Sequence, residues 1–219
     1  MYCYFSHLFF VKNLIIWNNL VKVIVRGAII VKSFKEKFSR FFEQPTRKGL
    51  REILRENYGE LDSLDFKGDW PSLSKMGKHL LAFANSGGGC IIVGVMEKNN
   101  SLYNKGLENM LDKSTFHNGV EKYIPQKLNY EIINFNYEDS DYSEIIGKSF
   151  QVLVIEDTPQ YIPFISQNDG DGIKKNNIYI RKGTKSLKAS YEDLQKIINK
   201  KIETNYSTDS EIKLEEHLS

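Results

Sequence analysis

Acidic side chains and a lysine gather between residues 60 and 97. The segment 60–67 reads ELDSLDFK, and an acid again follows the apolar run at 90–96. Carboxylates that converge beside a lysine suit a divalent cation and a phosphate ester. The carboxylates would hold Mg²⁺ or Mn²⁺, the metal would polarise a phosphoryl oxygen or activate water, and the lysine would offset developing charge.

The strand that must position these groups runs over 61–67. Strand alternation puts Ser63, Asp65 and Lys67 on one face, so the Asp65–Lys67 pair is geometrically sensible. Glu60 has the opposite parity and joins Asp65 only from a preceding turn or across a bulge. Acids around a strand are also typical of a solvated surface, and this interpretation stays open.

A second cluster of charges lies near the C-terminus. Residues 174–201 hold nine basic residues against two acidic ones, a net charge of +7, with Tyr179 and Tyr191 as potential stacking faces. Such a patch would bind phosphates with little sequence preference and strong salt dependence. A solvated strand edge and helix face is the alternative. The candidate binding residues are Lys174, Lys175, Arg181, Lys182, Lys185 and Lys188.

The charge distribution and the cysteine count exclude some classes of protein for this chain. The 219 residues carry a net charge of +2, which divides into +7 over residues 1–50 and −5 over 51–219. Residues 51–219 are therefore not basic overall, and any site in them that binds a polyanion must be a local patch. Two cysteines exclude a disulfide framework, and no Cys/His spacing fits zinc, so we expect a cytoplasmic protein.

The remaining patterns predict an α+β domain at 46–204, with a mixed sheet flanked by helices. Helices are expected at 46–57, 71–84, 107–123 and 190–204, and strands at 61–67, 90–96, 127–137, 149–156, 161–166 and 177–182. Asn85, Gly87, Gly88 and Gly89 form a structural turn after a helix. This order is wrong for a phosphate loop, which precedes a helix. Residues 205–219 are expected to be a mobile polar tail.

The first 45 residues are expected to form an apolar and basic helical extension. Their longest uncharged runs are too short for a bilayer span. Lys12, Lys22 and Arg26 share one helical stripe, which fits a membrane interface, whereas packing on the domain, or self-association through residues 1–31, is the alternative. A third interpretation is that these residues precede the true start.

The same sequence resembles the Schlafen AlbA_2 domain family. That family's core pattern is an acid followed by an LEFK strand, a helix ending in AFANT-GGG, and an apolar strand ending in Gly-Val and an acid. Here the matching segments read ELDSLDFK and AFANSGGGCIIVGVME. A weaker match continues through Pro125, Pro163 and YIRKGT at 179–184, so the resemblance covers roughly residues 47–200.

The resemblance implies a nucleic-acid-binding domain. The family is described as DNA-binding, is labelled ATPase-like in bacteria, and includes metal-dependent endoribonucleases. The nuclease members use three carboxylates, which match Glu60, Asp65 and Glu97 here. Asp65 replaces a glutamate and Glu97 an aspartate. The resemblance thus implies these three as catalytic residues and ligands of Mg²⁺ or Mn²⁺, with Lys67 beside them.

We therefore expect binding of DNA or RNA, with three alternatives. The first is a metal-dependent endoribonuclease, and the second is an ATP- or nucleotide-binding regulatory protein. The third is an interaction module tethered to a membrane through residues 1–43.

Overall fold

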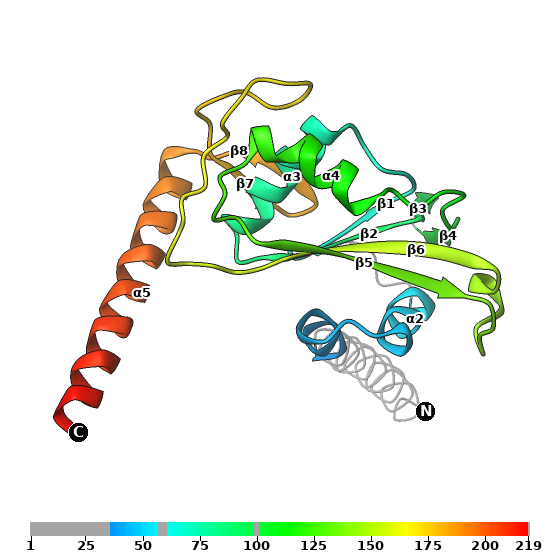
Figure 1. Ribbon diagram of the computed structural model, residues 1–219, viewed down its shortest axis with the longest axis horizontal. Coiled ribbons are helices and arrows are strands. Elements are labelled where there is room, and N and C mark those ends of the chain that lie inside the picture. Colours follow the sequence, from blue (N-terminus) through cyan, green and yellow to red (C-terminus); the bar gives the residue numbers. More distant parts are fainter. Residues whose placement is uncertain (1–35, 57–60, 99–100, 219) are drawn as a thin grey trace, which may run out of the picture. The chain divides into compact units, whose positions relative to one another are not determined.

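The chain divides into two compact units, residues 1–53 and 54–219. The computed structural model describes residues 36–56, 61–98 and 101–218 (Figure 1). The division falls within the helix α2 (Arg47–Glu56), eight residues after the predicted boundary at 45. The predicted helix over residues 1–31 and the candidate Glu60 lie outside the described residues.

A four-stranded mixed sheet organises the second unit. Its order is β1 (Leu64–Lys67), β2 (Gly89–Val93), β6 (Lys148–Ile155) and β5 (Tyr130–Tyr137). β1 runs parallel to β2, and the other neighbours are antiparallel. The parallel pair requires a crossover, which a helix supplies between the two strands. The predicted α+β class with a mixed sheet is confirmed.

Helices and two hairpins complete this unit. The crossover helix is α3 (Leu73–Ala84), and α4 (Lys113–Val120) lies with it on the side of the sheet that carries the hairpin β7–β8 (Figure 1). The remaining elements are β3 (Val95–Lys98), β4 (Ser101–Asn104), η1 (Glu121–Tyr123), η2 (Ser143–Ile145), β7 (Tyr179–Lys182), β8 (Lys185–Lys188) and α5 (Tyr191–Leu218).

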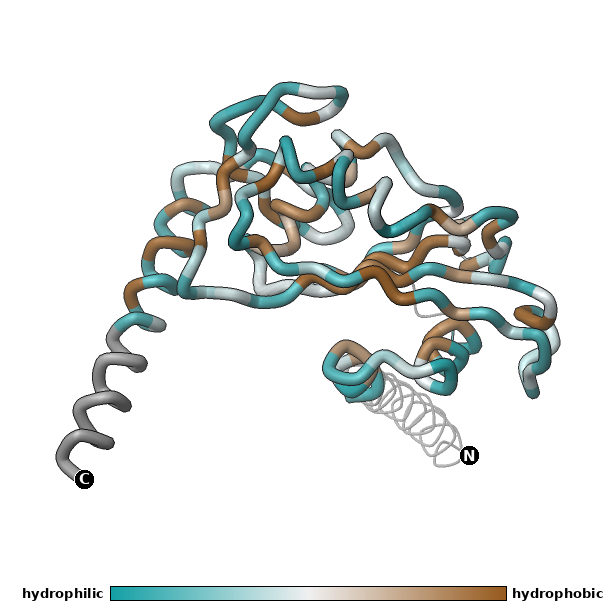
Figure 2. Tube along the Cα trace, viewed as in Figure 1, coloured by the Kyte–Doolittle hydropathy of each residue, from teal (hydrophilic) through white to brown (hydrophobic). Residues whose placement is uncertain are grey.

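The core lies between α3 and the sheet. Met76, Leu80 and Phe83 come from one face of α3 and are fully buried against residues of β2, β6 and α4. Every residue of β2 is buried, as its continuous apolar run predicts. Figure 2 shows the same pattern, with apolar segments concentrated along the central strands and α3.

The observed bounds of two elements differ from the predicted ones, because backbone groups in them hydrogen-bond to partners other than those expected. The apolar run 90–96 is not one strand: Gly94 has φ +105°, and β3 starts a separate hairpin after it. The helix expected from residue 107 begins six residues later. The Gln151 side chain bonds both the N–H and the C=O of Leu111, which holds that residue out of a helix. Asp112 then caps α4 by accepting from the Thr115 N–H.

Further differences lie toward the C-terminus. The segment 161–166 contributes only an isolated bridge between Ile165 and Ile178. Sequence patterns missed β4 and β8, which are four-residue strands without a clear apolar alternation. α5 continues past the predicted end at 204 to Leu218, and residues 184–219 contain neither Gly nor Pro to stop it.

The first unit, as far as it is described, contains two helical segments. Residues 36–43 are helical, and Thr46 caps α2 through a 3.1 Å bond from the Gly49 N–H to its Oγ1. Within the described ranges, no helix combines the length and the apolar composition that a bilayer crossing requires.

Two glycines with nearly the same backbone conformation test how closely the turn at Gly88 approaches the backbone of β6. Gly88 has φ +75° and Gly147 has φ +72°, so alanine at either site carries the left-handed cost of about 1 kcal/mol. A Cβ on Gly88 would lie 2.6 Å from the Ile155 carbonyl oxygen, whereas one on Gly147 would meet nothing within 4 Å. We expect Gly88→Ala to cost at least about 2 kcal/mol more than Gly147→Ala in urea unfolding. Equal losses would contradict the close approach of these backbones.

Candidate functional site

Asp65 in β1 is the centre of a buried ion-pair cluster. Its Oδ1 accepts a hydrogen bond from Lys67 Nζ at 2.6 Å, and its Oδ2 lies 3.4 Å from Nη1 of Arg181. The side chains of Asp65 and Arg181 are both 0% exposed, and Lys67 is 25% exposed. A buried carboxylate requires such partners, because its desolvation is unfavourable.

The Arg181 side chain is enclosed by the elements around β1. Its Cζ lies 4.5 Å from the centre of the Phe83 ring, and its Nε donates to the Asp62 carbonyl at 3.3 Å. Nη2 is buried and has no hydrogen-bond partner among the described residues. Sequence patterns placed Arg181 with the residues that bind nucleic acid. Its burial instead gives it a place in the core.

The turn after α3 holds β7 beside this cluster. The Asn85 amide donates to the carbonyls of Phe164 and Tyr179, and its Oδ1 accepts from the Phe164 N–H at 2.7 Å. Ser86 Oγ accepts from the Arg181 N–H at 2.9 Å. Consequently the AFANS segment and the YIRKG segment, far apart in sequence, are bonded to each other.

A family model described as "Schlafen, AlbA_2" matches residues 60–190. The chain belongs to the Schlafen AlbA_2 family. The matched range starts at ELDSLDFK and extends past β8, so it includes both Asp65 and Arg181.

Other comparisons add a distant structural likeness. No curated protein sequence matches the chain. Among solved structures, the chain is similar to the DIP2311 protein from Corynebacterium diphtheriae, with 14% sequence identity and a TM-score of 0.45. The likeness covers 71% of this chain and 31% of that protein, so it spans less than a third of the latter.

The glycines of this Schlafen AlbA_2 chain serve packing. Gly87, Gly88 and Gly89 all have positive φ, and a Cβ on Gly89 would lie 2.4 Å from the Ser63 carbonyl oxygen. They follow the C-terminal end of α3, where the helix dipole is negative. This turn therefore lacks the helix N-terminus on which a phosphate loop relies.

Of the three predicted carboxylates, Asp65 and Glu97 lie among the described residues. Asp65 is buried, Glu97 is exposed on β3, and Glu60 is outside the described ranges. In the part of the chain that the structure describes, no group of three His, Cys, Asp or Glu residues could hold a metal ion. Each carboxylate oxygen of Asp65 faces a protein cation, Lys67 at 2.6 Å and Arg181 at 3.4 Å. The metal site and its catalytic role stay predictions.

His79 and Ser186 join the cluster, although sequence patterns did not single them out. The spacing of His79 from Met76 and Phe83 was the available signal, because it places the imidazole on the apolar face of α3. His79 Nδ1 lies 2.9 Å from Ser186 Oγ and 4.0 Å from Asp65 Oδ2. Ser186 and Asp65 both face Nδ1 of His79. In a catalytic triad the serine and the aspartate bind opposite nitrogens of the histidine ring, so this arrangement would not activate Ser186 as a nucleophile.

Burial keeps two titratable groups beside the ion pairs, His79 and Cys90, in their neutral forms. It lowers the pKa of His79 to about 4, against the opposing effect of Asp65, so the imidazole is neutral at pH 7. Burial also raises the pKa of the Cys90 thiol, and Asp65 raises it further, so no thiolate nucleophile forms. The contacts of the cluster join β1, α3 and the β7–β8 hairpin.

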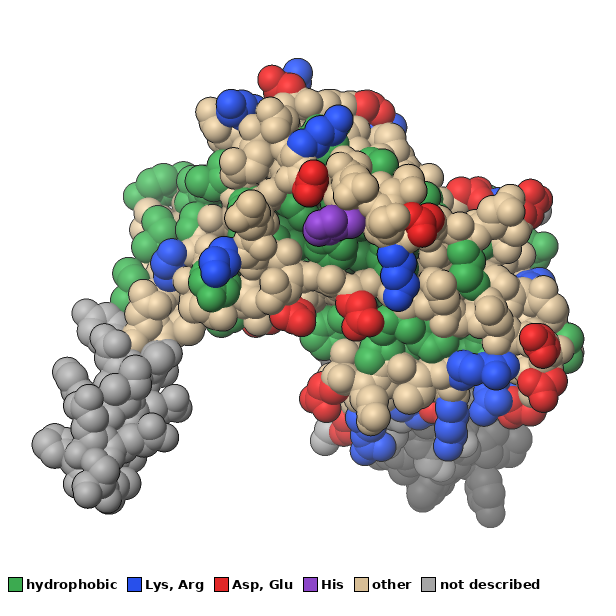
Figure 3. All heavy atoms as spheres, in the orientation of Figure 1, with side chains coloured by type: hydrophobic (Ala, Val, Ile, Leu, Met, Phe, Trp, Pro, Cys, Tyr) green, Lys and Arg blue, Asp and Glu red, His purple; other side chains and the backbone are tan. Residues whose placement is uncertain are grey.

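The predicted basic residues divide into paired and unpaired groups. Lys182 Nζ lies 2.8 Å from Asp193, Lys200 lies 2.9 Å from Asp157, and Lys174 lies 4.0 Å from Asp169. Five lysines of 174–201 have no acidic partner within 4 Å among the described residues: Lys175, Lys185, Lys188, Lys196 and Lys201. On the face in Figure 3, basic and acidic side chains are interspersed over the body, which agrees with a local rather than a broad basic region.

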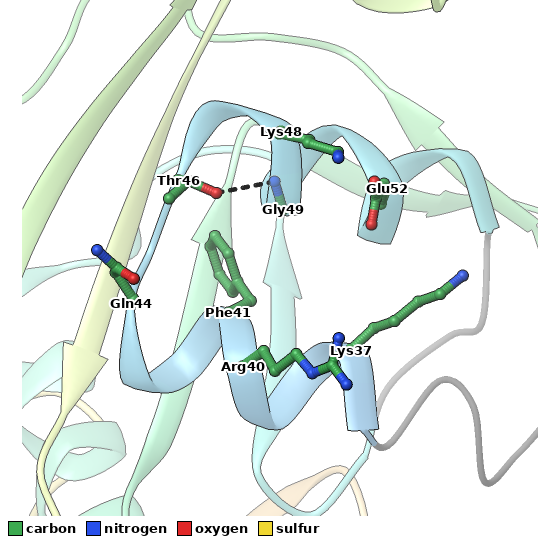
Figure 4. Close-up of a pocket in the computed structure, with 8 residues that line it drawn as sticks. All are labelled: Lys37, Arg40, Phe41, Gln44, Thr46, Lys48, Gly49 and Glu52. Atoms are coloured by element: carbon green, nitrogen blue, oxygen red, sulfur yellow. Dashed lines mark hydrogen bonds between the residues drawn. The ribbon is translucent and has the colours of Figure 1, made fainter.

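The first unit has a separate pocket of about 240 Å³. Lys37 and Arg40 reach it from the helix at 36–43, and Lys48 and Glu52 reach it from α2 (Figure 4). The Thr46 hydroxyl on its wall is bonded to the Gly49 N–H. Its remaining lining residues are Phe41, Gln44 and Gly49. Its lining includes no paired nucleophile and base, so it carries no catalytic assignment.

Replacing the buried carboxylate of Asp65 should lower the free energy of unfolding more than replacing an exposed carboxylate. Asp65→Asn leaves Arg181 and Lys67 without their anion, and we expect a loss of about 3–5 kcal/mol. The control is Asp171→Asn, since Asp171 pairs with Lys75 at 2.9 Å with 67% of its side chain exposed. That change should cost under about 1 kcal/mol. Urea unfolding measures both, and equal losses would refute a central role for Asp65.

Stability should depend on pH through His79. Its folded-state pKa of about 4 lies below the usual 6.5, so the unfolded chain binds the proton first. Stability present above pH 6.5 is lost as the pH falls toward 4, by on the order of 2 kcal/mol between pH 7 and 5. His79→Gln should remove this part of the dependence. If the variant and the wild type lose stability in parallel, the imidazole is not the titrating group.

Proposed function

We propose that this domain binds nucleic acid through its unpaired lysines, which we call the lysine surface: Lys175, Lys185, Lys188, Lys196 and Lys201. Membership of the Schlafen AlbA_2 family indicates a domain that works on nucleic acids or nucleotides. The lysine surface favours a nucleic acid over a nucleotide, because several separate cations match the repeated phosphates of a polymer.

The charge contrast is the observation that carries the proposal. Residues 51–219 have a net charge of −5, yet 174–201 alone have +7. After internal ion pairs are taken into account, the five lysines of the lysine surface keep their charge available.

The geometry of the β7–β8 hairpin supports the same function. Lys182 and Lys185 lie directly opposite each other across the hairpin, an arrangement in which like charges destabilise strand pairing. Asp193 offsets Lys182, and burial of Arg181 and Ser186 on the other face keeps the hairpin docked. Lys185 remains exposed beside the turn, where a phosphate would relieve the repulsion.

Charge reversal on the hairpin tests the proposal. We expect Lys185→Glu/Lys188→Glu to weaken binding to a mixed-sequence tRNA or DNA by about tenfold or more at low salt. The slope of log K against log salt should also fall by about 1.4 to 1.8, the contribution of two phosphates. Fluorescence anisotropy across a salt titration measures both quantities.

The matched control is Lys113→Glu/Lys127→Glu, which makes the same change in net charge at exposed lysines on other elements. This variant should keep most of the affinity and the original salt slope. Equal effects of the two double variants would show that net charge alone matters. Absence of wild-type binding at low salt would refute the proposal altogether.

A further inference from the structure

Tyr191 is a large ring exposed next to the lysine surface. It is the first residue of α5, and 71% of the residue is exposed. It follows Lys188 by three residues, and Lys182 of the hairpin bonds Asp193 two residues further on. An aromatic ring is therefore presented at the junction between the hairpin and α5.

The ring is carried by a well-bonded turn. The Ser190 N–H donates to Asp193 Oδ2 at 2.9 Å, and Ser190 Oγ donates to the same oxygen at 2.8 Å. Lys182 binds this carboxylate and, with these bonds, lowers the pKa of Asp193 to about 2. Glu192, the other acid of this turn, is the alternative acceptor for the single Ser190 hydroxyl proton, at 2.7 Å. Both acids are thus engaged at the start of the helix, which fixes the backbone that carries Tyr191.

The other two tyrosines that are clearly exposed among the described side chains each have a lysine over the ring. Lys148 Nζ lies 5.5 Å from the centre of the Tyr103 ring, and Lys127 Nζ lies 5.5 Å from that of Tyr161. Tyr191 has no such cation, ring neighbour or hydroxyl hydrogen bond among the described residues. Its ring is therefore available to a partner from outside.

We infer that Tyr191 is a stacking platform for an unpaired base, so that the lysine surface takes single-stranded nucleic acid in preference to duplex. This rests on the proposed function. Bases inside a duplex are covered on both faces by their neighbours, whereas an unpaired base can stack on a tyrosine. The lysines bind phosphates of either form, and only the ring distinguishes the two. Leu187, 43% exposed on β8, adds apolar area nearby.

The test uses the full chain and a 12-nucleotide oligomer with one central 2-aminopurine, free or annealed to its complement. Three forms are compared: wild type, Tyr191→Phe and Tyr191→Leu. Phenylalanine keeps the ring, while leucine keeps an apolar side chain without a π face. Because Tyr191 is exposed, all three should unfold at the same urea concentration.

Wild type and Tyr191→Phe should bind the single strand about tenfold more tightly than the duplex and quench its 2-aminopurine fluorescence. Tyr191→Leu should lose the quenching and the preference, and should still bind both forms in a salt-dependent manner. If Tyr191→Leu behaves as wild type, or if wild type shows no preference, the stacking role is refuted and the proposed function stands. If wild type binds neither form, both are refuted.

Discussion

The buried carboxylate of Asp65 joins β1 to β7, two strands that lie far apart in the sequence. It lies on an edge strand of the sheet and pairs with Arg181, which follows it by 116 residues. Arg181 in turn lies over Phe83 of α3 and bonds the carbonyl of Asp62. Because both charges are withdrawn from water, neither side chain is tolerated without the other. The position of β7 against β1 and α3 therefore depends on this pair.

Backbone bonds act in the same direction. Asn85 and Ser86, at the end of α3, bond the strand that carries Arg181. The glycines that follow let β2 start close to β1, since a side chain at Gly89 would strike the Ser63 carbonyl. The segments that identify the Schlafen AlbA_2 family are thus the parts that dock the β7–β8 hairpin onto the sheet.

Because the β7–β8 hairpin packs against the domain, the basic residues on its inner face are buried and those on its outer face are exposed. Arg181 and Ser186 are a cross-strand pair that is buried, while the next pair, Lys182 and Lys185, is exposed. One basic cluster in the sequence therefore has two roles. Its inward member neutralises a core carboxylate, and its outward members remain available to an external polyanion, beside an exposed tyrosine at the start of α5.

The local features of this fold could be predicted from sequence, because they depend on neighbouring residues. The apolar spacing of α3, the glycine turn after it and the apolar run of β2 are examples. The start of α4 could not be predicted, since it depends on Gln151, whose side chain binds Leu111. Likewise, only the tertiary structure determines which basic side chains of β7 point into the core and which point to solvent. Alternation makes Arg181 and Lys182 point to opposite sides, but only the distant Asp65 determines which of them enters the core.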